Sequence, residues 1–137
     1  YYLIRTSWVF GERGKNFVDA IMMLAQEKNE LKVVNDQYGR PTYTNDLSKK
    51  IKEIIETRKP FGTYHVTNSG TCTWFQFAKK IVEIAKLDTN VKPITSKEVD
   101  RTAKRPKYSV LLNTKLPPLR HWHGALEDHI QIMTGQR

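Results

Sequence analysis

A glycine-rich turn is the first feature of this sequence with potential for ligand chemistry. Gly11-Glu12-Arg13-Gly14 follows an apolar run and precedes a helical pattern, and Asp36 lies about twenty residues on, an arrangement that superficially matches a dinucleotide-binding fingerprint. Counting from Gly11, however, the second and the closing glycine of that fingerprint are replaced by Arg13 and Asn16. We therefore predict a plain turn and assign no cofactor-binding residue to the chain.

Tyrosine acid–base chemistry needs a basic neighbour. A lysine four residues after the tyrosine lowers the pKa of the phenol and prepares it to donate a proton. The residues four positions after the six tyrosines are Arg5, Thr6, Thr42, Leu47, Asn68 and Leu112. Since none of them is lysine, no catalytic residue is assigned within the chain.

The histidines do not form a metal-binding pattern. His121 and His123 bracket Trp122, but the sequence offers no third ligand at a spacing typical of zinc sites. We expect these two, together with His65 and His129, to lie on the surface or to pack in the core, and we assign no metal ligand.

The charge balance favours an anionic partner. The chain has 23 basic and 14 acidic residues and a net charge of +9, which suits nucleic acid, an acidic membrane surface or a phosphorylated small molecule. Aromatic and basic residues are not interleaved as in nucleic-acid modules, and the sequence has no apolar run long enough to span a bilayer. These patterns favour the small molecule over nucleic acid and membrane.

Two arginines stand in loops that glycine and proline restrain. Arg40 lies in Gly39-Arg40-Pro41-Thr42 and Arg105 in Lys104-Arg105-Pro106. A guanidinium on a restrained loop can donate two parallel hydrogen bonds to phosphate oxygens. The alternative for each is a solvated surface charge.

The elements that would position these residues alternate between strand and helix, which indicates an α/β fold in one domain. The apolar run Tyr2–Ile4 predicts a buried strand of a parallel sheet whose neighbours lie upstream. Asn16 is a predicted N-cap, Thr44 to Asp46 another, and Thr73 with Gln76 a capping box. Further strands are expected at 31–34, 63–66 and 91–95, and helices over 17–25, 47–55, 74–85 and 122–133. The single cysteine, Cys72, fits a reducing compartment, so we expect a cytoplasmic protein.

Four ordered segments together carry a resemblance to a known family. They are Arg5–Gly11 with Gly14–Phe17, Leu31–Thr42, Gly62–Asn68 with Trp74, and Ala103–Pro106 with Ser109 and Asn113. In this order and spacing they resemble the second half of the dTDP-4-dehydrorhamnose reductases, members of the extended short-chain dehydrogenase/reductase family. Any one segment is a weak signal, whereas the ordered set is specific.

The resemblance implies that residues 1–137 are a C-terminal substrate-binding part that includes one late strand of the Rossmann sheet near 2–8. An N-terminal Rossmann half, absent from this chain, would carry the NADPH or NADH site and the catalytic residues. The full-length parent would reduce dTDP-4-dehydro-L-rhamnose to dTDP-L-rhamnose, and this part alone would be inactive. Some relatives bind a bivalent metal between subunits, which leaves Mg²⁺ open and is compatible with a homo-oligomer.

By the same resemblance, Trp8 would lie against the deoxysugar, Asn16 and Phe17 near the diphosphate at a helix start, and Arg40 and Arg105 on the phosphates. The residue types alone also allow a buried Trp8 and an Asn16 that only caps a helix. A noncatalytic alternative is also open, because the regulatory beta subunit of methionine adenosyltransferase resembles these reductases. Sequence upstream of Tyr1 would help to separate the two readings.

Overall fold

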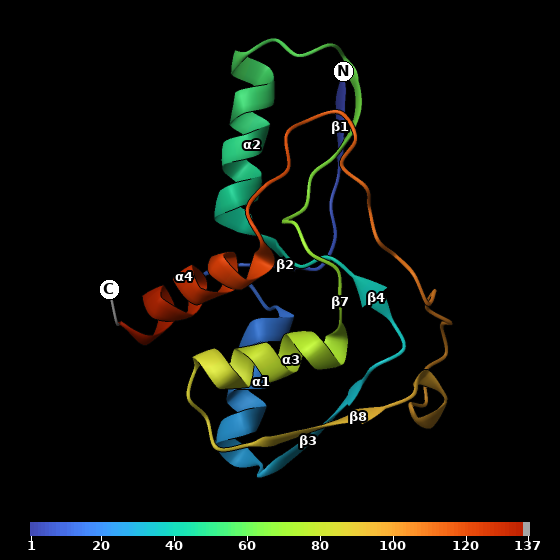
Figure 1. Ribbon diagram of the computed structural model, residues 1–137, viewed down its shortest axis with the longest axis vertical. Helices are drawn as coiled ribbons and strands as arrows, with labels where there is room; N and C mark the ends of the chain where they lie inside the picture. The colour runs from blue at the N-terminus through green and yellow to red at the C-terminus, as the bar shows by residue number, and fades with distance from the viewer. Residues whose placement is uncertain (136–137) are drawn as a thin grey trace.

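The computed structural model describes residues 1–135, and these form an α/β fold (Figure 1). The helices are α1 (Phe17–Glu27), α2 (Thr44–Glu56), α3 (Trp74–Ile84) and α4 (Trp122–Thr134), with a short 3-10 helix at Ser96–Glu98. The strands are β1 (Tyr2–Arg5), β2 (Val9–Phe10), β3 (Glu30–Val34), β4 (Tyr38–Gly39), β5 (Thr42–Tyr43), β6 (Gly62–His65), β7 (Cys72–Thr73) and β8 (Asn90–Ile94). The predicted α/β class is confirmed.

The strands pair two by two within the described part of the chain. β1 pairs with β6, β2 with β5 and β3 with β8, all in parallel, and β4 pairs with β7 in antiparallel. Figure 1 shows β1 and α2 at one end of the molecule and α1, α3, β3 and β8 at the other. Parallel pairs need long crossover connections, and here helices supply them.

The opening strand is parallel, as predicted, but the prediction of a buried strand is wrong for the described residues, because one face is half-buried and the other is exposed. Tyr2 and Ile4 pack with a small apolar cluster that includes Ile54 of α2 and Tyr64 of β6. Leu3 points to the opposite face and is 43% exposed. The alternation follows from the twofold side-chain period of a strand.

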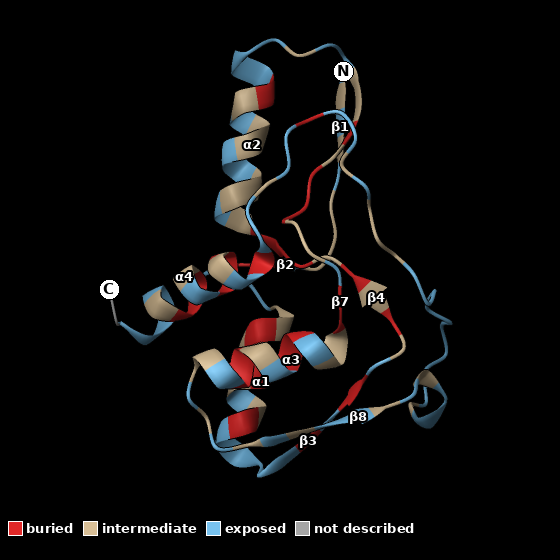
Figure 2. Ribbon diagram, viewed as in Figure 1, coloured by how far each residue is buried: buried red, intermediate tan, exposed pale blue. Residues whose placement is uncertain are grey.

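The main core lies where α1, α3 and α4 face one another, and Figure 2 shows the buried residues gathered on these helices. Phe77 of α3 is at its centre, with ring centroids 5.3 Å from Phe17, 5.7 Å from Phe10 and 5.4 Å from Trp122. Most of the predicted inward positions of α4 are buried, but Met133 is 41% exposed because it stands in the last turn of the helix. In α1, Val18 is buried in place of the expected Ala20.

The helix starts match the sequence signals in two cases of three. The Asn16 side chain accepts a hydrogen bond from the Asp19 N–H, and Thr73 with Gln76 forms the capping box. The expected cap at Thr44 to Asp46 is wrong, because α2 already begins at Thr44 and its N-cap is Tyr43, which makes no side-chain capping bond. These two capped starts fix the orientations of α1 and α3.

Candidate functional site

Trp8 occupies the tight connection between β1 and β2 in an unusual backbone conformation. Its φ angle is 47°, in the left-handed region, where a bulky side chain crowds its own backbone at a cost of about 1–3 kcal/mol. Such outliers persist only where the surroundings impose them, and they gather at functional sites. Arg58 and Lys86, which follow the ends of α2 and α3, also have positive φ angles, but of these three residues Trp8 alone is one that the resemblance places against a ligand.

The Trp8 ring joins an aromatic wall, which we define as Trp8, Phe17 and Trp74. The Trp8 and Trp74 rings are stacked, with centroids 3.6 Å apart and planes inclined by 14°. Phe17 lies 4.7 Å from Trp74 in a tilted contact. The structure thus brings together Trp8 from the β1–β2 connection, Phe17 from the start of α1 and Trp74 from the start of α3.

A trough runs along this wall. One cavity of about 360 Å³ is lined by Phe17 and Trp74 together with Arg101 and Arg105. It shares Val34, Gln37, Val99 and both arginines with a second cavity of about 310 Å³. A smaller side pocket of about 210 Å³ is lined by Trp8, Gln37, Trp74, Arg105, Pro106 and Ser109. Three predicted residues, Trp8, Phe17 and Arg105, therefore line connected cavities.

Apart from Lys32 of β3, the cations that line the trough come from one segment, residues 97–107, which we call the basic loop. Asp36 holds its start, because its carboxylate accepts hydrogen bonds from the Ser96 N–H and hydroxyl, with the N–H bonds at 3.0–3.1 Å. These bonds from Ser96 also lower the pKa of Asp36. Tyr38 holds the other end, where its N–H donates to the Lys107 carbonyl at 2.7 Å and its carbonyl accepts from the Ser109 N–H at 2.9 Å. Lys97, Arg101, Lys104 and Arg105 are exposed between these anchors.

Two predicted residues lie beside the trough and do not line the cavities described above. The Asn16 amide donates to the Gly11 carbonyl at 3.0 Å and to the Asp19 carboxylate at 2.8 Å, so its polar atoms serve the start of α1. The Arg40 carbonyl accepts from the Ser7 hydroxyl at 2.8 Å, and its Nε lies 3.4 Å from the Thr71 hydroxyl. Contact of Asn16 and Arg40 with a ligand remains a prediction.

The glycine turn has a structural explanation. A Cβ placed on Gly11 would overlap the Thr44 side chain, and Gly14 has a φ of 84°. Gly11 is needed for close packing against α2, and Gly14 for the turn itself. Asp36, the residue at the ribose position of the fingerprint, is hydrogen-bonded to Ser96. The absence of cofactor-binding residues from the chain stays a prediction.

Two residues of the trough were absent from the predicted site. Trp74 lines the larger cavity and the side pocket, and Gln37, which is only 8% exposed, lines all three cavities. The Gln37 Nε2 donates to the Ser96 hydroxyl at 3.2 Å. Both residues stand inside the segments that carry the resemblance, so their position in these segments was the available signal.

Other parts of the chain are weaker candidates for a ligand or catalytic site. Two larger hollows, of about 450 and 500 Å³, contain no predicted site residue. Burial raises the pKa of the Cys72 thiol to about 12, so it stays protonated and is a poor nucleophile. Over residues 1–135, no three metal-binding side chains are grouped so as to hold an ion, and none of the helices is long and apolar enough to cross a membrane.

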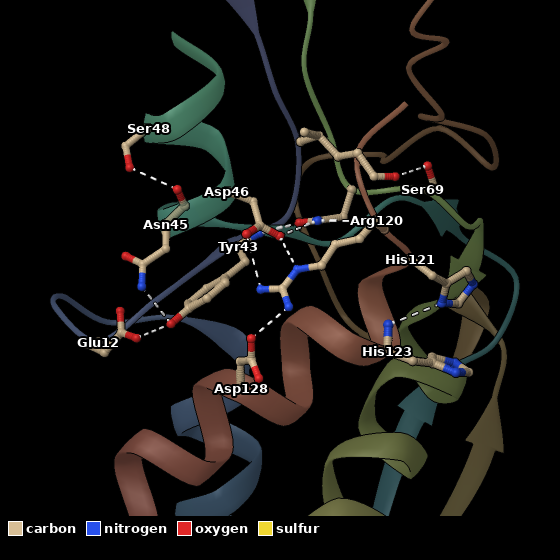
Figure 3. Close-up of polar contacts among 12 residues, drawn as sticks. Glu12, Tyr43, Asn45, Asp46, Ser48, Ser69, Arg120, His121, His123 and Asp128 are labelled. Atoms are coloured by element: carbon tan, nitrogen blue, oxygen red, sulfur yellow. Dashed lines mark hydrogen bonds and ion pairs between the residues drawn. The ribbon is translucent and has the colours of Figure 1, made fainter. Parts of the chain in front are cut away.

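A separate polar seam joins α4 to α2 (Figure 3). Arg120 donates to Asp46 of α2 at 2.8 Å and to Asp128 of α4 at 2.7 Å, and these bonds raise the pKa of its guanidinium. The Tyr43 hydroxyl donates to the Glu12 carboxylate and accepts from Asn45. Because these charged groups are paired with one another, the seam connects α2 and α4.

Comparison with known proteins identifies the family of the chain. Residues 1–134 match the family model described as the RmlD substrate binding domain. The chain belongs to this family. It is 43% identical to the spore coat polysaccharide biosynthesis protein SpsK of Bacillus subtilis over 94% of its length and 46% of that protein.

Two solved structures are also similar to the chain. The dTDP-4-dehydrorhamnose reductase of Bacillus anthracis, crystallised with NADP, is 41% identical with a TM-score of 0.90, over 94% of this chain and 47% of that one. The corresponding enzyme of Clostridium acetobutylicum is 40% identical with a TM-score of 0.93, over 98% and 49%. The family resemblance predicted from the four segments is confirmed, and the chain spans about half the length of these relatives.

Proposed function

We propose that the chain is the dTDP-sugar-binding part of a dTDP-4-dehydrorhamnose reductase, which reduces dTDP-4-dehydro-L-rhamnose to dTDP-L-rhamnose with NADPH or NADH. The observation that carries the proposal is the trough, where an aromatic wall and the Arg105 guanidinium line the same cavity. A nucleotide sugar needs both kinds of surface, because its base and deoxysugar present apolar faces while its diphosphate carries two negative charges.

In this proposal the chain's own residues bind and orient the substrate. Trp8 and Trp74 line the side pocket and would bound the deoxysugar, and Arg105, which lines both that pocket and the larger cavity, would hold the diphosphate between sugar and base. The proline after Arg105 and the anchors of the basic loop limit how far the guanidinium can move, which favours the correct register of the sugar. Hydride would come from the nicotinamide, and the residues that hold that cofactor and donate the proton are expected in an N-terminal Rossmann half.

The arrangement of β1 supports such a second half. Its outer face carries the 43% exposed Leu3, and β6 covers only one of its two edges among the described residues. Unpaired strand edges and exposed apolar faces favour association with further strands or helices. We propose that β1 is a late strand of the Rossmann sheet, that an upstream strand pairs with its free edge, and that the full-length enzyme works in the cytoplasm.

The test uses the full-length protein that contains this chain. We expect it to oxidise NADPH or NADH when dTDP-4-dehydro-L-rhamnose is added and to bind dTDP-L-rhamnose in calorimetry. The isolated chain should show no turnover, because it contains no tyrosine followed by lysine at the fourth position. A full-length protein that binds neither the nucleotide sugar nor the cofactor would refute the proposal, and one that binds both without turnover would favour the noncatalytic reading.

A further inference from the structure

The surroundings must stabilise the backbone conformation of Trp8, because a φ of 47° is unfavourable for a tryptophan by itself. The backbone around it is held on both sides. The Trp8 carbonyl accepts from the Thr42 N–H at 3.1 Å, and the preceding Ser7 donates its hydroxyl to the Arg40 carbonyl at 2.8 Å. These bonds tie the Trp8 turn to the segment that leads from β4 into β5.

Two residues fix the ring itself. Trp74 stacks on it at a centroid distance of 3.6 Å, and the backbone of Gly39 lies so close that a Cβ there would overlap ring atoms Cε2, Cζ2 and Nε1. Gly39 is buried although its backbone φ is not in the left-handed region, so it is the close approach of the ring that requires glycine here. The indole of Trp8 is therefore stacked on Trp74 and lies against the backbone of Gly39, where a side chain would overlap it.

We propose that Trp74 and Gly39 are positioning residues that hold Trp8 in its left-handed conformation and thereby shape the sugar end of the trough. The inference rests on the proposed function, since it assigns how the sugar pocket is set and which residues determine its selectivity for the sugar. It extends the predicted role of Trp8 to Gly39, which acts through Trp8, and to Trp74, which supports the Trp8 ring and also lines the pocket.

The surroundings distinguish this role from ordinary core packing. Phe77, on the same helix as Trp74, is fully buried, whereas Trp74 is only half-buried and lines both the larger cavity and the side pocket. Gly39 lines neither of these cavities, and the atoms nearest to a Cβ at Gly39 belong to the Trp8 ring, so Trp8 is the first group that Gly39→Ala would displace. Gly39 is for that reason the cleaner position for a test.

The experiment compares two ligands on the full-length protein. dTDP occupies only the nucleotide end, whereas dTDP-L-rhamnose also fills the sugar end, so the ratio of their affinities measures the sugar pocket alone. In Gly39→Ala we expect the affinity for dTDP-L-rhamnose to fall roughly three- to tenfold, as loss of a well-formed aromatic contact would produce, and that for dTDP to stay within about twofold. Trp74→Phe should shift the same ratio in the same direction, because the smaller ring overlaps Trp8 less.

A second measurement follows Trp8 directly. Two indoles stacked this closely couple their electronic transitions, so the wild type should show an exciton pair of bands in circular dichroism. Gly39→Ala should weaken these bands with both tryptophans present. The control is Phe75→Leu, the neighbour of Trp74 on α3 that does not line the trough, and it should leave the bands and the affinity ratio unchanged.

The outcomes distinguish failure of the positioning role from failure of the proposed function. If wild type binds both ligands and the affinity ratio is unchanged in Gly39→Ala, the positioning role is wrong and the proposed function stands. If Gly39→Ala does not fold, Trp74→Phe is measured with and without Trp8→Ala. A reduced ratio that disappears in the Trp8→Ala background supports the inference, whereas an unchanged ratio, or a reduction that persists without Trp8, overturns it. If the wild type binds neither ligand, the proposed function fails and the inference fails with it.

Discussion

The aromatic wall of the trough is held by packing, whereas the basic loop that shares its cavity is held by hydrogen bonds at its two ends. Trp74 packs against both Trp8 and Phe17, and all three rings pack against the buried ring of Phe77. Between the anchors of the loop, at Ser96 and at Lys107 to Ser109, the charged side chains are exposed (Figure 2). The wall has a fixed shape, while the loop presents charge whose position depends on a few bonds.

The packed wall and the exposed loop are expected to contribute differently to affinity and selectivity. A preorganised apolar surface distinguishes ligands by shape, because displaced rings would leave cavities or clashes. Exposed cations attract any phosphate and distinguish poorly between them, except where a guanidinium can make two parallel hydrogen bonds. Substitutions in the wall should therefore damage the fold and selectivity, and substitutions in the loop should change affinity alone.

The largest effect is expected on the free energy of unfolding, from substitution of Phe77, against which the aromatic wall packs. Phe77→Ala should lower the free energy of unfolding by about 3–5 kcal/mol, because Phe77 is fully buried and a cavity would remain among several rings. Urea denaturation followed by tryptophan fluorescence would measure it. Phe77→Leu is the matched control and should cost much less; a loss below about 1 kcal/mol in Phe77→Ala would contradict the packed wall.

The second effect is on ligand affinity, and it should differ between Arg105 and Arg40. Arg105→Ala in the full-length protein should weaken binding of dTDP-L-rhamnose roughly ten- to a hundredfold, the value of one charge-assisted contact, and Arg105→Lys should restore only part. Arg40→Ala should have a smaller effect, since Arg40 does not line the trough cavities and its Nε lies near Thr71. Calorimetry would decide, and an Arg40→Ala defect equal to that of Arg105→Ala would remove this distinction.

A third effect is a pH dependence of the free energy of unfolding, and it arises from His129. His129 is fully buried in α4 and faces Phe10, Tyr43, Glu12 and Asp19, with ring nitrogens 3.7 Å and 3.9 Å from the two carboxylates. Burial lowers its pKa below the ordinary 6.5, although both carboxylates act in the opposite direction. The unfolded chain therefore binds the proton more readily, and stability should fall as the pH drops below about 6.5.

The measurement is the urea midpoint at pH 7.5 and at pH 5.5 for wild type and His129→Phe. The phenyl ring keeps the packing but cannot take up a proton, so the loss of stability on acidification should be smaller in the variant. An equal loss in both proteins would assign the acid sensitivity to other groups.

The smallest effect is expected for a loop cation outside the side pocket. Lys104 is exposed and lines only the second cavity, so Lys104→Gln should change dTDP-L-rhamnose affinity by less than about threefold. Raising the salt concentration should reduce the difference between variant and wild type further. If Lys104→Gln lowered the affinity as much as Arg105→Ala, the basic loop would attract the ligand through its total charge and not through a specific Arg105 contact.

The sequence predicted the α/β class and most of the elements, because helical and strand periodicity and local caps report on nearby residues. The expectation that Trp8, Phe17 and Arg105 contact a ligand came from the family resemblance alone, and in the structure these three residues line neighbouring cavities. The sequence did not predict that Asp36 anchors the basic loop, because Asp36 and Ser96 are far apart in sequence and meet only in the fold. The roles of Trp74 and Gln37 were missed for the same reason, since a lining position depends on tertiary packing. The cap of α2 was misplaced because polar residues in a first helical turn resemble a cap.

The long parallel pairs also bear on the order in which the chain folds. Tyr2 stands opposite Gly62 and Glu30 opposite Asn90, so each pair must close a loop of about sixty residues at a similar entropic cost. α3 packs on both β3 and β8, whereas β1 and β6 meet only a small cluster with α2. The amide hydrogens of β1 and β6 should therefore exchange with solvent earlier than those of β3 and β8, and the trough end should be the part that forms first.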